Sequence, residues 1–365
     1  MGLIVERIRL ADFRNYERAE FEIGPELTIA AGPNATGKTT IIEALELTTA
    51  GESFRQPSWR DVIRWGAAEA KVSMNAGGDN REYAIEMGVS GSGKRQYVVN
   101  GSKARRVSDM RGNVPAVVFT PDDLDVVKGP AEKRRASIDS LGDQLSATYE
   151  TLRREYEQIV RQRNAALKEA QHDVVAALTA SLTETGAKYA AHRIRLLDRV
   201  ATPACEIHDT VSGGDHLEIA YVSSWGEVPE AEGEDATASI AKLLGETLDR
   251  KAEDEVARGM TLAGHHRDDI AFLVGGRSAR DFASQGQQRS IALAWKLAEV
   301  RAVEEIAGAS PILLLDDVMS ELDEARRAAL TAFVGGRVQT VVTTTNMGYF
   351  DPEMLESASI IRLTR

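Results

Sequence analysis

Near the start of the chain, apolar residues first alternate with polar ones and later recur at helical spacing, which predicts strands followed by a helix. Residues Ile4–Leu10 alternate between apolar and polar, Leu27–Ala31 form a short apolar run, and Thr39–Ala50 carry apolar residues at helical spacing. Gly-rich turns separate three further short strands, expected at Lys71–Met74, Glu82–Val89 and Gln96–Asn100. Short strands in this order are typical of an antiparallel meander.

The middle of the chain has helical periodicity. From Ile138 to Ile159 apolar or aromatic residues recur every three or four positions, and helical character continues to about Val200 with a break expected near Gly186. An αα-hairpin is the simplest interpretation, and its short length favours a packed helical lobe over a free coiled coil. A strand is expected at Leu217–Val222. The acidic residues that follow predict a solvated loop containing Glu227, Glu230, Glu232, Glu234 and Asp235.

Strands and helices alternate again from about Thr261. The expected strands are Ile270–Val274, Ile312–Asp316 and Gln339–Thr344, and the expected helices are Gly286–Ala307 and Asp323–Val334. Such alternation predicts a parallel sheet whose ligand site lies at the carboxyl ends of the strands.

The composition is that of a folded soluble protein. Of the 365 residues, 43% are hydrophobic, and 44 Lys and Arg against 56 Asp and Glu give a net charge of −12. Cys205 is the only cysteine, which excludes an internal disulfide and a Cys-rich zinc site, so a reducing cytoplasm is expected. No apolar stretch approaches the roughly 20 residues that span a bilayer, so we expect no membrane insertion. The acidic balance still leaves room for a local basic patch that contacts nucleic-acid phosphates.

A glycine-rich stretch between the strand Leu27–Ala31 and the following helix matches the P-loop pattern G-x-x-x-x-G-K-[ST]. Its residues are Gly32, Pro33, Asn34, Ala35, Thr36, Gly37, Lys38 and Thr39. In such a loop the backbone amides cradle nucleotide phosphates, the Lys38 ammonium reaches the outer phosphates, and the Thr39 hydroxyl binds Mg²⁺. The pattern and its strand–helix context together predict a nucleotide-binding site.

The apolar strand Ile312–Asp316 ends in two carboxylates and resembles a Walker B strand. We expect Asp316 to hold Mg²⁺ through a water, and Asp317 to position and polarise the water that attacks the γ-phosphate. Most of the chain separates Lys38 from Asp316, so the ATPase core must be split in sequence. We therefore predict an α/β head formed by residues 1–125 and 260–365, with residues 126–259 inserted as a helical lobe or short arm.

A third motif, Ser284–Arg289, opens the helix before the Walker B strand. A Ser cap, a glycine and exposed amides form a second anion site, which a chain with a complete P-loop would use on the nucleotide of a partner subunit. This is the logic of the signature motif in ABC-type ATPases, assigned here to Ser284, Gln285, Gly286 and Gln287. The segment after the Walker B strand resembles a D-loop, with Ser320 and Asp323 expected at the dimer interface.

In their order, these motifs resemble the RecF family of SMC-like ABC ATPases over nearly the whole chain. Further matching passages are Phe13–Tyr16, Gly51–Arg55, Phe119–Leu124, Lys128-Gly129, Arg134-Arg135, Gln162–Asn164 and Gly264–Asp269. The resemblance implies a mixed or parallel sheet with helices, a short coiled-coil-like arm, and nucleotide contacts from Arg14, Asn15 and Thr40. It also implies ATP and Mg²⁺ as cofactors, an ATP-dependent homodimer, and weak DNA-dependent ATP hydrolysis. Loading at gapped or single-stranded DNA with RecO and RecR, and roles in replication, recombinational repair and SOS induction, follow from the same resemblance.

Three positions depart from the usual motifs. Ala35 stands where many P-loops have glycine, which matters if the backbone there requires a positive φ. Asp317 replaces the catalytic glutamate of ABC ATPases, and its shorter reach suits slow hydrolysis. No histidine follows the strand Gln339–Thr344, so a threonine, assigned here to Thr344, would sense the γ-phosphate.

Two basic clusters are candidate DNA contacts. The first lies in Gly91–Gly112, where Asp109 is the only acidic residue against Lys94, Arg95, Lys103, Arg105, Arg106 and Arg111. The second is on the helical arm and contains Arg153, Arg154, Arg161 and Arg163. Aromatic residues make up 5% of the chain and do not interleave with these charges. We therefore expect salt-sensitive contacts to the phosphate backbone rather than base stacking.

The combined patterns predict a cytoplasmic DNA-binding ATPase in which two subunits sandwich two ATP molecules, close on DNA and open after hydrolysis. Two alternatives stay open at this point. The nucleotide-binding subunit of an ABC transporter would bring the P-loop and the signature motif closer together in sequence. A structural SMC-type tether would need long helical arms.

Overall fold

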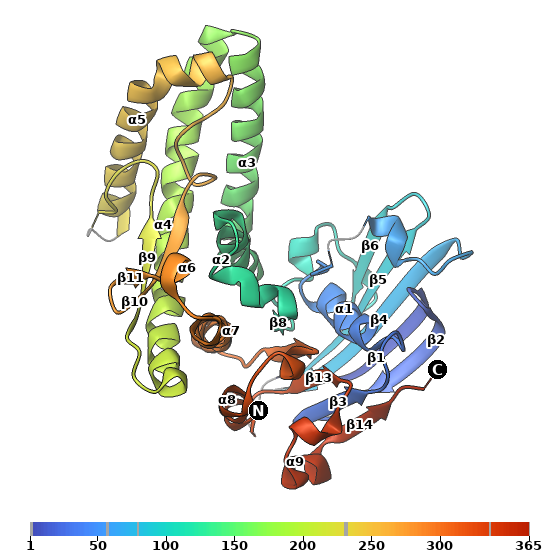
Figure 1. The fold of residues 1–365 in the computed structure, drawn as a ribbon. Helices are drawn as coiled ribbons and strands as arrows, with labels where there is room; N and C mark the ends of the chain where they lie inside the picture. The colour runs from blue at the N-terminus through green and yellow to red at the C-terminus, as the bar shows by residue number, and fades with distance from the viewer. Residues whose placement is uncertain (1–2, 56–57, 79, 230–232, 336, 365) are drawn as a thin grey trace. The chain divides into compact units, whose positions relative to one another are not determined.

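The computed structural model describes residues 3–55, 58–78, 80–229, 233–335 and 337–364 (Figure 1). Contacts divide the chain into two compact units. The first unit contains residues 1–125, 210–213 and 289–365, and the second contains residues 126–209 and 214–288. Residues 260–288, which the sequence pattern placed with the head, therefore fall in the second unit. The reason is strand pairing, since a strand within this segment pairs with one from the middle of the chain.

A parallel sheet of five strands forms the centre of the first unit. Its order is β14 (Ser359–Arg362), β3 (Leu27–Ala31), β13 (Thr340–Thr344), β12 (Ile312–Asp316) and β8 (Ala116–Phe119). Every neighbouring pair is parallel. All residues of β12 and β13 are buried, as expected for continuous apolar strands inside a parallel sheet. The predicted strand bounds here agree with the structure to within one residue.

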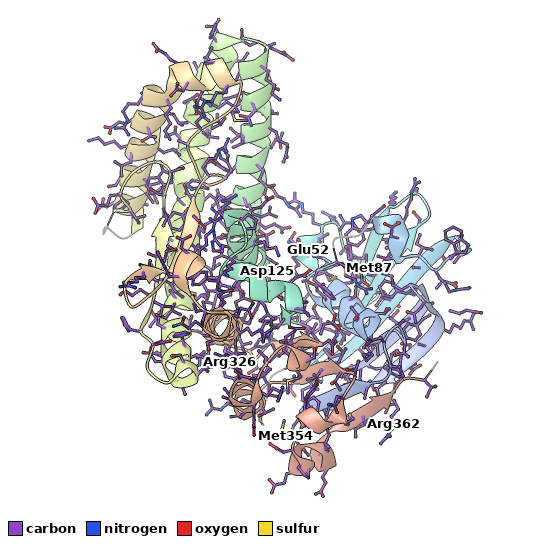
Figure 2. All side chains as sticks on the ribbon, in the orientation of Figure 1. Glu52, Met87, Asp125, Arg326, Met354 and Arg362 are labelled. Carbon is purple, nitrogen blue, oxygen red and sulfur yellow. The ribbon has the colours of Figure 1, made fainter. Side chains whose placement is uncertain are left out.

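The second sheet of this unit is antiparallel and contains the predicted meander. Its order is β2 (Tyr16–Glu22), β1 (Ile4–Phe13), β4 (Glu69–Gly78), β5 (Arg81–Ser90), β6 (Arg95–Val99) and β7 (Ser102–Lys103). Helix α1 (Lys38–Thr49) contacts strands of both sheets, so it is buried on nearly all sides. Side chains such as Ile8, Ile41 and Met87 belong to one buried core, and Figure 2 shows where Met87 lies on β5.

Helices complete the first unit around the parallel sheet (Figure 1). They are α7 (Gln285–Ala307), which begins in the second unit, α8 (Glu324–Val334) and α9 (Pro352–Ser357). Short 3-10 helices span Trp59–Val62, Val107–Asp109, Pro121–Val126, Val318–Ser320 and Met347–Tyr349.

The second unit is mainly helical. Its helices are α2 (Ala131–Leu145), α3 (Ala147–Lys168), α4 (His172–Ser212), α5 (Gly233–Arg258) and the short α6 (Ala279–Phe282). A small antiparallel sheet has the order β11 (Arg277–Ser278), β10 (Asp269–Val274) and β9 (Leu217–Val222). The predicted αα-hairpin is present as α3 and α4, and the strand predicted at Leu217–Val222 is present as β9.

The turn of this hairpin lies between Lys168 and His172, so the break predicted near Gly186 is wrong. Gly186 is a buried residue inside α4. A Cβ at this position would stand 3.1 Å from both Leu244 and Tyr156. The glycine is therefore a packing site, where a neighbouring helix approaches closely, and not a helix end.

Helix α5 was not predicted, because its acidic start resembles a solvated loop. Glu234 and Asp235 lie in its first turn, where negative charge is favourable at a helix N-terminus. Glu227 precedes the helix in an exposed segment, whereas Glu230 and Glu232 lie outside the described residues. The same charges that indicate solvation in the sequence thus serve here as a helix start.

Two buried ion pairs hold the helices of the second unit together. Arg193 on α4 binds Asp139 on α2 at 2.7 Å, and Arg163 on α3 binds Glu255 on α5 at 2.6 Å. Removing one partner of such a pair leaves a buried charge, at a typical cost of about 3–5 kcal/mol. The passage Gln162–Asn164 therefore has a structural role, since Asn164 also accepts a hydrogen bond from the Thr261 backbone N–H at 2.7 Å.

Candidate nucleotide-binding site

The P-loop joins β3 to α1 as the sequence predicts. The Lys38 ammonium donates hydrogen bonds to the carbonyl oxygens of Gly32 at 2.8 Å and Pro33 at 2.9 Å. The Thr36 hydroxyl also donates to the Pro33 carbonyl, at 2.9 Å. Within the described residues, the first turn of α1 has no acidic residue and no side-chain cap. The Thr40 N–H bonds to the Gly37 carbonyl at 3.1 Å, and none of the described side chains competes with an anion at this helix start, where the helix dipole favours negative charge.

Two residues of the loop have a left-handed backbone. Ala35 has φ of 65° and Gly37 has φ of 95°. A Cβ at Gly37 would also stand 2.6 Å from Asn15 Nδ2 and 2.7 Å from the Tyr16 hydroxyl. Position 35 thus does require the conformation that its alanine disfavours, at a cost of roughly 1–2 kcal/mol.

The turn between β1 and β2 lies against the start of α1. The Thr40 hydroxyl donates to Asn15 Oδ1 at 3.2 Å, and Arg14 Nε donates to Glu43 Oε2 at 2.9 Å. The Glu43 carboxylate is fully buried and also accepts from Arg55 and Ser53. Glu43 therefore holds both arginines close to the P-loop.

The Walker B carboxylates lie at the carboxyl end of β12. Thr343 stands opposite Asp316 on β13, and its hydroxyl donates to Asp316 Oδ1 at 2.7 Å. The same hydroxyl accepts from the Asp317 backbone N–H at 2.9 Å. Sequence reasoning missed Thr343, because its role depends on the register between two strands far apart in the chain.

Asp317 is the least satisfied polar group of this site. Its Oδ1 is buried without a hydrogen-bond partner among the described residues, and its backbone φ is 53°. Burial raises the pKa of the Asp317 carboxyl, the Lys38 charge opposes this rise, and Asp316 and Glu321 add to it. An orphaned carboxylate oxygen beside a lysine fits a group that acts on a water or a metal ion.

One cavity of about 790 Å³ joins the P-loop to this carboxylate, since both Lys38 and Asp317 line it. Its volume falls within the range of ligand and cofactor sites. The predicted residues that line it are Arg14, Asn15, Asn34, Ala35, Gly37, Lys38, Thr39, Thr40 and Asp317. Gly32, Pro33 and Thr36 instead shape the loop through the hydrogen bonds described above. Sequence reasoning also missed Arg55, Arg60, Asp61, Ile63 and Trp65, which line the same cavity.

The predicted signature motif forms a reciprocal cap at the start of α7. The Ser284 hydroxyl accepts from the Gln287 N–H at 3.2 Å, and the Gln287 side-chain oxygen accepts from the Ser284 N–H at 2.9 Å. Gln287 also donates to Asp215 at 2.8 Å. Ser284 and Gln285 are exposed, and Gly286 is partly exposed. The cap holds these residues in one conformation at the surface of the second unit.

The predicted D-loop residues have local structural contacts. The Ser320 hydroxyl donates to the Asp317 carbonyl at 2.8 Å, and Asp323 caps α8 by accepting from the Arg326 N–H at 3.0 Å. Both residues are exposed. The Thr344 hydroxyl is buried and bonded at 3.0 Å to the backbone of Asn346, so this contact favours Thr344 as a turn residue more than as a phosphate sensor.

The first basic cluster has exposed side chains. Lys103, Arg105 and Arg106 are exposed, and the backbone N–H groups of the two arginines are held by Asp109 at 2.9 and 3.0 Å. The second cluster is more engaged within the protein. Arg153 binds Asp143 bidentately as well as Glu157, and Arg154 pairs with Glu150 at 2.5 Å. Arg153 is thus less available to a phosphate than the sequence indicated.

Replacing Thr343 with valine should lower stability by about 1–3 kcal/mol, because it leaves Asp316 Oδ1 and the Asp317 N–H without their shared partner. Thermal unfolding measures this change. Thr340→Val is the matched control, since the buried Thr340 hydroxyl on the same strand donates a local hydrogen bond to the Val338 carbonyl and bonds neither Asp316 nor Asp317 among the described residues. Equal unfolding midpoints for the two variants would contradict the bridging role of Thr343.

These features define a class of protein. A P-loop, a Walker B strand on a parallel sheet, an antiparallel sheet and an inserted helical unit together form an ABC-type ATPase head of the SMC kind. The family model described as RecF/RecN/SMC N terminal domain matches residues 4–362. In the part of the chain that the structure describes, every helix is too short or too polar to cross a membrane.

Comparison with relatives and solved structures identifies the family within this class. The chain is 34% identical to the DNA replication and repair protein RecF of Acaryochloris marina, over 98% of this chain and 97% of that protein. It is 37% identical to the RecF of a Synechococcus strain, over 98% and 95% of the two chains. A solved structure of the recombination mediator RecF with ATP matches with a TM-score of 0.88 and 28% identity, over 96% of this chain and 94% of that one. The chain belongs to the RecF family.

Proposed function

We propose that this chain is an ATP-dependent DNA-binding protein of recombinational repair and replication. Two copies close around two ATP molecules, and the closed dimer acts as a clamp on single-stranded or gapped DNA. The observation that carries the proposal is the single cavity lined by Lys38, Thr39 and Asp317. A RecF relative solved with ATP at 28% identity supports the choice of nucleotide.

Different residues in and around the cavity bind the phosphates, hold Mg²⁺ and position the attacking water. Lys38 and the backbone N–H groups at the start of α1 bind the phosphates. Thr39 and Asp316 would hold Mg²⁺, which neutralises phosphate charge when bound. Asp317 orients the attacking water through the buried oxygen that has no partner among the described side chains. Because the aspartate is one carbon shorter than glutamate, hydrolysis is slow, and it is proposed to be stimulated by DNA.

ATP acts in this scheme by stabilising the dimer. The capped helix start at Ser284, Gln285, Gly286 and Gln287 receives the nucleotide of the partner copy, and Ser320 and Asp323 lie at the same interface. A ligand that binds only the closed dimer shifts the association equilibrium by mass action. Slow hydrolysis then works as a timer that reopens the clamp. RecO and RecR are the proposed protein partners.

The length of the helical arm favours the clamp hypothesis over an SMC-type chromosome tether. Helices α3 and α4 have 22 and 41 residues, which correspond to roughly 33 and 62 Å at 1.5 Å per residue. A tether would need arms several times longer. The family relationship leaves no reason to prefer a transporter subunit.

Sedimentation velocity with a labelled gapped duplex tests the proposal directly. With Mg²⁺ and ATP we expect a complex containing two protein copies and DNA, and with ADP we expect monomer and free DNA. A protein that stays monomeric and off DNA under every nucleotide condition would refute the clamp.

The double variant Arg105→Glu with Arg106→Glu should weaken binding to gapped duplex at least roughly tenfold and reduce the salt dependence of binding. ATP affinity should not change, because neither side chain lines the cavity. The double variant Arg18→Glu with Arg81→Glu is the matched control, since both of its residues are exposed and the change in net charge is the same. If both double variants weaken DNA binding equally, bulk charge and not this cluster is responsible.

A further inference from the structure

Trp65 is the most exposed large apolar side chain among the described residues, ahead of Phe282 at 73%. It is 97% exposed, whereas Trp225 and Trp295 are each 1% exposed. Trp59 is partly buried and its ring is covered by the Arg95 guanidinium at 4.1 Å. A tryptophan has one of the largest apolar surfaces to bury, so a single one presented to water calls for an explanation.

The backbone that carries Trp65 is held on both sides. Arg64 N–H donates to the Asp12 carbonyl at 2.8 Å, and the Arg64 side chain binds the Asp12 carboxylate at 2.7 Å. Ala67 N–H donates to the Arg64 carbonyl at 3.0 Å, which closes a four-residue turn with Trp65 at its second position. Gly66 at the third position has φ of 87°, as a type II turn requires. The turn therefore fixes the backbone position from which the indole projects, and the exposed indole has its faces free.

Trp65 lines the same cavity as Lys38, Thr39 and Asp317. The roles proposed above use Lys38, Thr39 and Asp317 for phosphates, metal and water, and they leave the nucleoside without a partner. Arg60, Asp61 and Ile63 from the same segment also line the cavity, and of these Ile63 adds apolar surface to that of the indole. An exposed aromatic face can stack on a flat nucleobase, which gains most from such contact.

We propose that the Trp65 indole stacks on the purine base of the nucleotide held by the P-loop, and that it determines the preference for purine over pyrimidine nucleotides. This inference rests on the proposed nucleotide site and adds the part of the ligand that the phosphate-binding residues do not recognise.

Calorimetric titration of the full chain with ADP, CDP and inorganic pyrophosphate tests the inference. ADP is not hydrolysed and leaves the protein monomeric in the scheme above. Trp65→Ala should weaken ADP binding roughly 5- to 100-fold, the range that base–aromatic stacking corresponds to. Trp65→Phe should restore most of the ADP affinity. Trp65→Ala should lower the affinity for CDP less than it lowers the affinity for ADP. Pyrophosphate affinity should be the same in wild type and Trp65→Ala, which also shows that the variant is folded.

Tryptophan fluorescence gives a second readout. The exposed indole of Trp65 should be quenched and shielded from acrylamide when ADP binds. Trp59→Phe should keep this change, since Trp59 does not line the cavity, and Trp65→Phe should lose it.

The outcomes separate the inference from the function on which it rests. Equal ADP affinity in wild type and Trp65→Ala, with pyrophosphate bound by both, overturns the stacking role alone. Loss of ATP-dependent dimers in Trp65→Ala at unchanged ADP affinity also overturns it and indicates a subunit contact. A wild-type protein that binds neither ADP nor pyrophosphate refutes the proposed nucleotide site itself.

Discussion

Replacing Lys38 with methionine should weaken ATP binding at least roughly 100-fold, which corresponds to about 3 kcal/mol, and abolish ATP-dependent dimers on DNA. The Lys38 ammonium already points at the mouth of the P-loop, where it donates to the Gly32 and Pro33 carbonyls at 2.8 and 2.9 Å. Methionine is unbranched and only one atom shorter than lysine, but it removes the charge that meets the outer phosphates. Calorimetry with ATP and sedimentation velocity with gapped duplex measure the two effects.

Lys71→Met is the matched control for this experiment. Lys71 lies on β4 of the same unit, is exposed, and pairs with Glu86 at 2.6 Å, away from the cavity. It should leave ATP binding and dimer formation unchanged. A Lys38→Met protein that binds ATP as tightly as wild type would show that the nucleotide lies elsewhere.

Replacing Asp317 with asparagine should slow ATP hydrolysis roughly 100- to 1,000-fold while keeping ATP binding. Asparagine has nearly the same shape, so the left-handed turn at φ of 53° is retained, but it cannot accept the proton of the attacking water. Because dimers would reopen only after hydrolysis, the clamp on DNA should persist longer in this variant. Steady-state phosphate release and the dissociation rate of the DNA complex measure both effects.

Glu321→Gln is the matched control for the loss of charge. Glu321 also raises the pKa of Asp317, yet it is half-exposed and pairs with Arg289 at 3.3 Å. Its neutral variant should change the hydrolysis rate only a few-fold. If it slowed hydrolysis as much as Asp317→Asn, the effect would belong to the local field and not to a base at Asp317.

The raised pKa of Asp317 also predicts how stability depends on pH. A carboxyl whose pKa is higher in the folded protein binds its proton more tightly there, so its ionised form opposes folding at neutral pH. Asp317→Asn should therefore raise the unfolding temperature slightly at pH 7 in the absence of nucleotide. The difference should shrink as the pH falls through the raised pKa of the folded protein, and it should vanish below the usual carboxyl pKa of 3.8, where both states are protonated.

Several passages that mark the family serve the fold and not the site. Asp268, from the passage Gly264–Asp269, accepts hydrogen bonds from the Tyr221 hydroxyl at 2.6 Å and the Trp225 indole at 2.9 Å, and it contacts His265. Burial raises the pKa of the Asp268 carboxyl, but the hydrogen bond and charge of His265, together with the bonds from Tyr221 and the Ser224 backbone, hold this pKa well below its usual range. A conspicuous string of charged residues can thus be a buried network, which the sequence pattern alone does not distinguish from a catalytic one.

The sequence by itself determined the strands and helices that have a local cause. The P-loop, the Walker B strand and the Ser284 cap each depend on residues within one turn or one strand, so their spacing specified them. Where the conformation of a segment depends on residues far away in the chain, only the tertiary structure determines it. Gly186 lies inside α4 because a neighbouring helix needs the space, and the start of α5 is a helix because its acids meet a helix dipole.

The same distinction holds for the site. Lys38, Thr39, Asp316 and Asp317 follow from motifs, whereas Thr343 and Trp65 do not. Thr343 reaches Asp316 only because β12 and β13 pair in one register, and Trp65 reaches the cavity only because its turn is bonded to the end of β1. Contacts between residues far apart in the chain come from strand pairing and packing, which a local pattern of hydrophobic and polar positions does not encode.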